Sequence, residues 1–201
     1  MSAAFMHIPA TLEDLLAIPE NERFHEIICG ELVRKAMPSF RHGRSQGGLV
    51  GRLGRPYNRR PGGRFPGGWW FVMETEVQFD KHEIYRPDLA GWRRERMPEI
   101  PNEFPVSLRP DWVCEILSPS NAKNDVVLKM RTYHRCQVPH YWIIDPISET
   151  LQVHRWSDQG YVVVQSASGT ERIAAEPFEA VRLSVRGILE GDEDDDDPPA
   201  P

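Results

Sequence analysis

The 201-residue sequence predicts an α/β fold, and three observations support that prediction. Residues 112–145 hold an apolar strand-like segment, a helix-forming segment and a second apolar strand-like segment, the pattern of parallel strands joined by a right-handed crossover. Other strand-like segments come in pairs separated by short turns, which predicts antiparallel hairpins. The composition, 40% hydrophobic and 27% charged, is typical of a folded chain. We expect one domain over residues 1–190 and a disordered acidic tail over 191–201.

A short helix and a hairpin are expected first. The segment from Thr11 to Ile18 predicts a helix, because Thr11 can cap it, Asp14 can complete a capping box and Pro19 ends it. Residues 23–35 predict a hairpin with Cys29 and Gly30 at its tight turn.

The next segment is basic and rich in glycine and proline. Residues 38–51 can form a helix weakened by glycines, and residues 52–68 predict a flexible loop without regular structure. No acid occurs between Leu32 and Met73, whereas residues 192–197 are all acidic. This split suggests contact with a polyanion, with a solvated loop as the alternative. The arginines expected to contact nucleic acid are Arg41, Arg44, Arg52, Arg55, Arg59, Arg60 and Arg64.

Two long strands and a buried strand are expected in the middle of the chain. Residues 69–78 and 84–92 predict a hairpin of two continuous strands, and the polar residues 93–109 predict a surface connection. Residues 112–117 (WVCEIL) predict a strand buried on both faces, because only Glu115 interrupts its apolar run.

The second half of the chain continues with a helix and further strands. Residues 118–121 predict a turn that caps a helix from about Ala122 to Cys136, on which Asp125, Lys129 and Tyr133 share a face. Residues 140–145 predict a strand parallel to the one at 112–117, and residues 151–165 predict a hairpin. A last short element is expected within residues 181–189.

Composition also excludes some classes of protein. The three cysteines form no CxxC pair, so a disulfide framework or a zinc-thiolate site is not expected. The sequence has no run of about 18 apolar residues and no signal peptide, so we expect a cytoplasmic protein with no membrane partner.

Two acids and a lysine are the candidate catalytic groups. Asp88 and Glu115 each lie in an apolar strand-like segment, where a carboxylate needs compensation for its lost hydration, and Lys129 lies on the helix that follows Glu115. Two carboxylates and waters suit Mg²⁺, and the backbone carbonyl of Ile116 could add a ligand. An ammonium beside the transition state would stabilise its charge, although a helix lysine is often only solvated.

Glu26 is a further candidate, because it alternates with the apolar residues Phe24 and Ile28. A position at the rim, with its carboxylate in water, is the commoner outcome for such an acid. His42 and His140 are expected to be structural.

Several motifs resemble the Uma-two family, which belongs to the PD-(D/E)XK nuclease superfamily of restriction-endonuclease-like proteins. They are FHEIICGELV, PSFRHGR, RPDLAGW, VCEILSPSN, the D-xxx-K-xxx-Y helix and VPHYWIIDP. The resemblance implies a restriction-endonuclease-like mixed β-sheet flanked by helices, to which the other hairpins would be added. It implies a site of Asp88, Glu115, a lysine and Glu26. The usual lysine position, two residues after the glutamate, is Leu117 here, which points to Lys129. Gln137 and His140 also depart from the family pattern.

These observations predict an endonuclease that hydrolyses DNA with Mg²⁺, or with Mn²⁺ in its place, and that needs no small-molecule cofactor. A homodimer is expected, since cleavage of both strands of a duplex needs two sites. The alternative is a nuclease fold that has lost cleavage and acts as a nucleic-acid-binding or regulatory module. A weaker alternative is a hydrolase of small phosphate esters.

Overall fold

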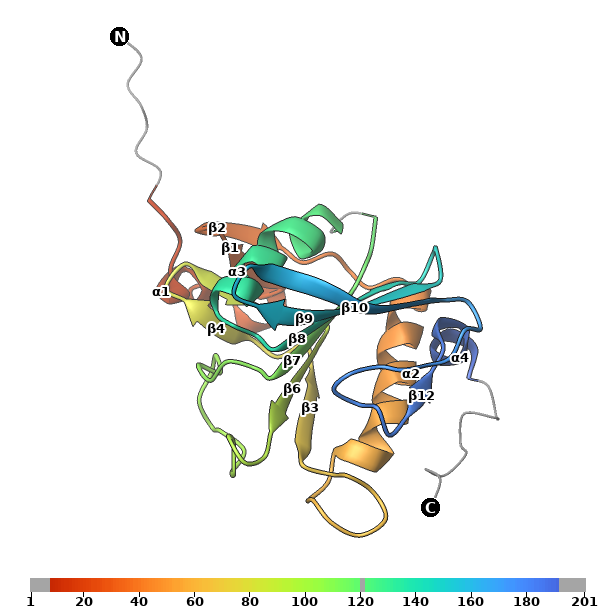
Figure 1. Ribbon diagram of the computed structural model, residues 1–201. Coiled ribbons are helices and arrows are strands. Elements are labelled where there is room, and N and C mark those ends of the chain that lie inside the picture. Colours follow the sequence, from red (N-terminus) through yellow and green to blue (C-terminus); the bar gives the residue numbers. More distant parts are fainter. Residues whose placement is uncertain (1–7, 120–121, 192–201) are drawn as a thin grey trace.

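The computed structural model describes residues 8–119 and 122–191 (Figure 1). Within these ranges the strands form a large sheet in the order β10-β9-β8-β7-β6-β3, a small sheet in the order β2-β1-β5-β4, and the short pair β11-β12. The strands are β1 (His25–Ile28), β2 (Glu31–Arg34), β3 (Trp69–Met73), β4 (Val77–Asp80), β5 (Glu83–Tyr85), β6 (Leu89–Arg93), β7 (Trp112–Ile116), β8 (His140–Asp145), β9 (Thr150–Ser157), β10 (Gly160–Ser168), β11 (Ile173–Ala174) and β12 (Arg182–Leu183). The helices are α1 (Leu12–Leu16), η1 (Glu20–Glu22), α2 (Phe40–Tyr57), η2 (Asn124–Lys129), α3 (Met130–Arg135) and α4 (Val185–Glu190).

The parallel pair expected at the centre of the large sheet is confirmed. Strand β7 pairs in parallel with β8, with Cys114 opposite Trp142, and the chain between them passes through η2 and α3. The neighbouring pairs β6–β7 and β8–β9 are antiparallel, so the sheet is mixed. All five residues of β7 are buried, which agrees with a central strand covered on both faces.

Different helices cover the two faces of the large sheet (Figure 1). Alternate residues of β7, such as Trp112 and Ile116, pack with Leu49 and Leu53 of α2 and Ile188 of α4. The intervening residue Val113 packs on the other face, with residues of α3 and of the small sheet. Because side chains alternate along a strand, Glu115 belongs to this second face, between the large sheet, α3 and the small sheet.

The first two predicted elements are confirmed. Helix α1 follows Thr11, whose backbone N–H donates to the Asp14 carboxylate at 2.8 Å. Strands β1 and β2 form the expected hairpin, with Ile28 opposite Glu31. Cys29 and Gly30 have φ of 52° and 78°, the positive values that a two-residue hairpin turn of type I′ requires.

The prediction that residues 52–68 lack regular structure is wrong at its start. Helix α2 begins after its cap residue Ser39 and continues to Tyr57, through several glycines and Pro56. Burial explains the difference, because Leu49, Leu53 and Tyr57 are each at most 4% exposed against the sheet and α4. This tertiary packing offsets the weak helix propensity of the glycines.

The two continuous strands predicted at 69–78 and 84–92 are each broken in the middle. Strands β3 and β6 pair in the large sheet, whereas β4 and β5 pair in the small sheet. Glu74, with φ of 52°, lies at the first break, and residues 86–88 form the second. The break turns both strands out of one sheet and into the other, so this hairpin joins the two sheets.

Later elements follow the expected order with adjusted bounds. The predicted helix at 122–136 is η2, a π-helix, followed by α3. The predicted hairpin at 151–165 is β9–β10, and the element at 181–189 is β12 with α4. Residues 120–121 of the predicted capping turn and residues 192–201 of the predicted tail lie outside the described residues. None of the helices in the described part of the chain is sufficiently long and apolar to cross a membrane.

Candidate functional site

Asp88 and Glu115 lie next to each other on neighbouring strands of the large sheet. Asp88 directly precedes β6, and its Oδ2 accepts a hydrogen bond from the Ile116 backbone N–H at 2.7 Å. Its own backbone N–H donates to Glu115 Oε2 at 3.4 Å. Both residues are almost completely buried, at 2% and 1% exposure. The antiparallel pairing of β6 with β7 therefore places the two carboxylates together at one end of the strands.

Lys129 lies behind these acids and contacts three carboxylates. Its Nζ is 2.8 Å from Glu26 Oε1, 3.2 Å from Asp125 Oδ1 and 3.4 Å from Glu115 Oε1. One helical segment supplies both Asp125 and Lys129, and the Tyr133 hydroxyl on α3 donates to Glu115 Oε1 at 2.5 Å. The ammonium is 1% exposed, so these acids replace its hydration.

Glu26 belongs to the same cluster, so the alternative of a solvated rim position does not hold. Its side chain is 3% exposed, and besides Lys129 it accepts a hydrogen bond from the Arg86 backbone N–H at 2.7 Å. The small sheet brings it there, because β1 pairs with β5, which is followed directly by Arg86.

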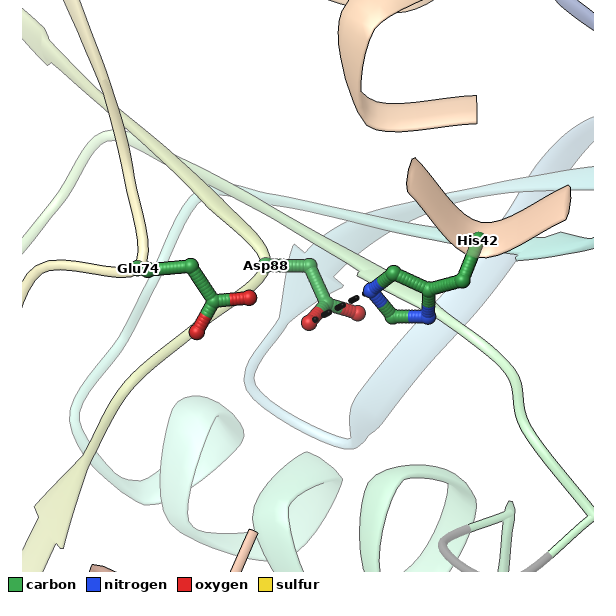
Figure 2. Close-up of side chains that lie close together, drawn as sticks. All are labelled: His42, Glu74 and Asp88. Atoms are coloured by element: carbon green, nitrogen blue, oxygen red, sulfur yellow. Dashed lines mark ion pairs between the residues drawn. The ribbon is translucent and has the colours of Figure 1, made fainter. Parts of the chain in front are cut away.

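Three further residues meet at the more exposed side of the site, which we call its mouth. His42 of α2 and Glu74 at the strand break lie beside Asp88 (Figure 2). The third residue is Lys35, which follows β2. Lys35 Nζ lies 2.7 Å from Glu74 Oε2 and 2.8 Å from Asp88 Oδ1. His42 Nε2 lies 3.3 Å from Asp88 Oδ1. The Glu74 side chain is 31% exposed, so the site opens to solvent on this side.

We call the carboxyl groups of Glu26, Glu74, Asp88, Glu115 and Asp125, with the ammonium groups of Lys35 and Lys129, the acidic cluster. Its members come from both sheets and from η2, and they are joined by the contacts given above. Five carboxyl groups share two ammonium groups here among the described residues. Such an excess of carboxylates suits a divalent cation.

Comparison with known proteins gives one family. The model of the family described as "Putative restriction endonuclease", Uma2, matches residues 12–186. The chain belongs to the Uma2 family. A solved structure with a similar fold is the crystal structure of "a putative nuclease belonging to DUF820 from Anabaena variabilis ATCC 29413", at 24% identity and a TM-score of 0.70. The alignment covers 90% of this chain and 98% of that chain. The comparison confirms the expected restriction-endonuclease-like fold. None of the curated proteins compared with the chain matches it.

The charges of this Uma2 cluster depend on one another. Burial raises the pKa of Glu115 to about 8, with Asp125 and Asp88 adding to the rise and Lys129 opposing it. Burial alone would also raise the pKa of Asp88, but Lys35 and His42 hold it well below its usual range. Burial alone would lower the pKa of Lys129, but its three acidic neighbours raise it well above its usual value. The cluster thus holds Asp88 ionised while Glu115 titrates near neutral pH.

Sequence reasoning missed Lys35, His42 and Glu74 as site residues. The sequence pattern does not single out Lys35 or Glu74, and it predicts a structural role for His42. One signal was present: the PSFRHGR segment of the family resemblance includes His42. Nothing in the local pattern predicts the strand break that turns Glu74 toward Asp88.

The predicted arginines lie along α2 and the loop after it. Near the site, Arg41 Nη1 donates to the Pro146 carbonyl and Arg44 Nε to the Leu189 carbonyl. At the far end, the guanidinium groups of Arg55, Arg59 and Arg64 lie 5.5 to 5.6 Å from the Phe65 ring centre. Arg60 is exposed, and Arg52, on α2, is partly buried. A surface hollow of about 430 Å³ near Pro61 and Trp69 borders this loop and includes none of the clustered acids.

Proposed function

We propose that this Uma2 protein is a divalent-metal-dependent endonuclease that hydrolyses phosphodiester bonds in DNA. The observation that carries the proposal is the convergence of Asp88, Glu115, Glu26 and Lys129, from separate segments, in one cluster with more carboxyl than ammonium groups. Family membership and the fold support the same reaction class.

Asp88 and Glu115 would hold Mg²⁺, or Mn²⁺ in its place, with the Ile116 carbonyl as a further ligand. The residues fit such an ion, because the two carboxyl groups are adjacent and buried, and the acidic cluster as a whole has more carboxyl than ammonium groups. When bound, the ion would offset the charge of the phosphodiester and lower the pKa of a coordinated water. The hydrogen bond from Ile116 N–H to Asp88 keeps one carboxylate oriented before substrate arrives.

The two lysines would have different roles. Lys129 is buried behind the carboxyl groups, and we propose that it keeps Glu26 and Glu115 in place and favours the ionised form of Glu115. Lys35 lies at the mouth, with its side chain 11% exposed, and is the ammonium nearer to a phosphate that enters from solvent. Glu26 would hold Lys129 and provide further negative charge near the metal.

We propose that DNA lies along α2, in contact with the seven arginines predicted from the sequence between Arg41 and Arg64. The helix rises about 1.5 Å per residue, so Arg41 and Arg55 are roughly 21 Å apart along it. That span corresponds to about six base pairs at 3.4 Å each. One duplex could therefore contact arginines at both ends of the helix while one of its phosphates occupies the acidic cluster. Cleavage of both strands would require a homodimer, which sedimentation analysis would detect.

The test is nicking of a supercoiled plasmid with Mg²⁺ or Mn²⁺. We expect wild-type protein to cleave, Asp88→Asn and Glu115→Gln to lose cleavage, and Asp158→Asn, an exposed acid at the β9–β10 turn, to retain it. Equal cleavage by all four proteins would refute the assignment. DNA binding without cleavage by the wild type would support the alternative, a nuclease fold that acts as a binding module. Comparing plasmid cleavage by Lys35→Gln with cleavage by Lys129→Gln then separates the proposed roles of the two lysines.

A further inference from the structure

We propose that His42, Glu74 and Asp88 form a second metal site, which binds a first-row transition-metal dication such as Mn²⁺ through an imidazole and two carboxylates. The proposal goes beyond the Mg²⁺ site of Asp88 and Glu115 and shares with it the residue Asp88. It rests on the geometry of three side chains and not on nuclease activity.

The three side chains point toward one another from three separate segments (Figure 2). One possible ligand atom from each residue lies within 4.8 Å of the other two, and His42 Nε2 is 3.3 Å from Asp88 Oδ1. Adjacent ligands of one ion, each about 2.1 Å from it, lie about 3 Å apart. His42 and Asp88 already meet this spacing. Glu74, the most exposed of the three, would need only a small side-chain movement.

His42 provides the observation that points to a ligand. The residue is 6% exposed, and neither of its ring nitrogens has a hydrogen-bond partner within the described part of the chain; Nε2 has only an ion-pair contact with Asp88 Oδ1 there, at 3.3 Å. Buried polar atoms are almost always hydrogen-bonded, because the loss of hydration without a partner is costly. A metal ion bound to Nε2 would replace this long contact with a coordination bond.

Lys35 occupies the place where the ion would bind. Its ammonium bridges Glu74 Oε2 and Asp88 Oδ1, at 2.7 and 2.8 Å. Gln46 Nε2 donates to the other oxygen, Glu74 Oε1, at 2.9 Å and so orients that carboxylate. A dication and an ammonium would repel each other between the same two oxygens. We therefore infer that Lys35, which is carried on a flexible side chain, moves away when the metal binds.

The ligand set determines which metal is preferred. Mg²⁺ prefers oxygen ligands and retains several waters, whereas imidazole suits transition metals. Asp88 can serve both sites, because Oδ1 faces His42 and Lys35 while Oδ2 faces the Ile116 N–H. Metal ions in two-metal hydrolytic sites are about 3.5–4 Å apart, a distance that one shared carboxylate can bridge.

The test is titration of the full-length protein with Mn²⁺, followed by calorimetry and by pulsed electron paramagnetic resonance, which detects a nitrogen nucleus bonded to manganese. We expect the wild type to show a histidine nitrogen signal. His42→Gln should remove that signal, and loss of this ligand should weaken Mn²⁺ binding by about tenfold or more. Glu74→Gln should weaken binding, and Lys35→Met should strengthen it, because the competing ammonium is gone.

Glu115→Gln distinguishes this site from the proposed nuclease site. That variant should lose cleavage and yet retain the nitrogen signal, since Glu115 is not one of the three ligands. A wild-type Mn²⁺ complex without a nitrogen signal would overturn the proposal, as would a signal that persists in His42→Gln. Absence of DNA cleavage by the wild type would count against the proposed function and would leave this spectroscopic result interpretable.

Discussion

Lys129→Met is the change that most directly tests how the acidic cluster is held together. Methionine has a similar length and no charge, so it removes the ammonium with little change in volume. The carboxyl groups of Glu26, Asp125 and Glu115 would lose the partner that they share inside the protein. Their nearest oxygens lie 2.8, 3.2 and 3.4 Å from Lys129 Nζ. Breaking a buried ion pair by removal of one partner costs about 3–5 kcal/mol. We expect a loss of that size in the free energy of unfolding at pH 7.

The loss should depend on pH in a defined direction. Burial raises the pKa values of Glu115 and Asp125 and Lys129 opposes the rise, so both values rise further without the ammonium. A folded protein with raised acid pKa values is destabilised as pH rises through the range between the unfolded and folded values. The destabilisation should therefore be larger at pH 8.5 than at pH 5.5. Urea unfolding followed by tryptophan fluorescence at both pH values measures it.

Lys123→Met is the matched control, because Lys123 precedes the same helix and is exposed. It should change stability by less than about 0.5 kcal/mol. If the unfolding free energy of Lys129→Met is within about 1 kcal/mol of the wild-type value at both pH values, the ammonium does not hold the acids together, and this explanation is refuted. If the variant does not fold at pH 8.5, refolding on transfer to pH 5.5 is still expected, and failure to refold there would also contradict the argument.

Three other predictions concern packing, pH and DNA. A Cβ at Gly48 would lie 1.9 Å from the Ile188 carbonyl oxygen, whereas one at Gly47 would meet no described residue within 4 Å. Gly48→Ala should therefore lower the unfolding free energy by about 2–3 kcal/mol, and Gly47→Ala should raise it by about 1 kcal/mol. Equal effects in urea melts would contradict the α2–α4 packing. Burial, with the guanidinium groups of Arg93 and Arg155, lowers the pKa of His140 to about 4. The folded state then binds fewer protons than the unfolded state above that pH. Acidification from pH 7 to 5 should therefore lower the unfolding free energy of the wild type by about 2 kcal/mol more than that of His140→Asn. An identical pH dependence of the two proteins in urea melts would disprove this prediction. The third prediction concerns the slope of log affinity for DNA against log salt concentration. A triple variant with Arg59→Gln, Arg60→Gln and Arg64→Gln should reduce that slope by about 0.9 for each phosphate that is no longer neutralised. The control Lys81→Gln, in the β4–β5 turn, should leave the slope unchanged.

Elements that bury a regular apolar pattern could be predicted from the sequence. The parallel pair β7–β8 and the Cys29-Gly30 hairpin follow from patterns confined to a few residues. The length of α2 could not be predicted, because Leu53 and Tyr57 stabilise its glycine-rich end through contacts with distant parts of the chain. Likewise, the π-helix η2 and the strand breaks depend on how the two sheets meet.

The residues of the candidate site also differ in how well the sequence predicts them. The apolar segments around Asp88 and Glu115 single out these two acids, Glu26 alternates with apolar residues, and the family resemblance points to Lys129. The structure brings these four residues together. Their catalytic roles stay predictions. Lys35 and Glu74 carry no such signal, because the end of a hairpin and a strand break, and not an apolar pattern, place them beside Asp88. His42 reaches Asp88 from helix α2.

The broken hairpin makes the site sensitive to mechanical separation of its two halves. Glu26 and Lys35 are attached to the small sheet, whereas Asp88 and Glu115 are attached to the large one. Any displacement of one sheet from the other pulls the clustered groups apart, even if each sheet stays intact. The geometry of the site therefore depends on the relative position of the two sheets as much as on the fold of either one.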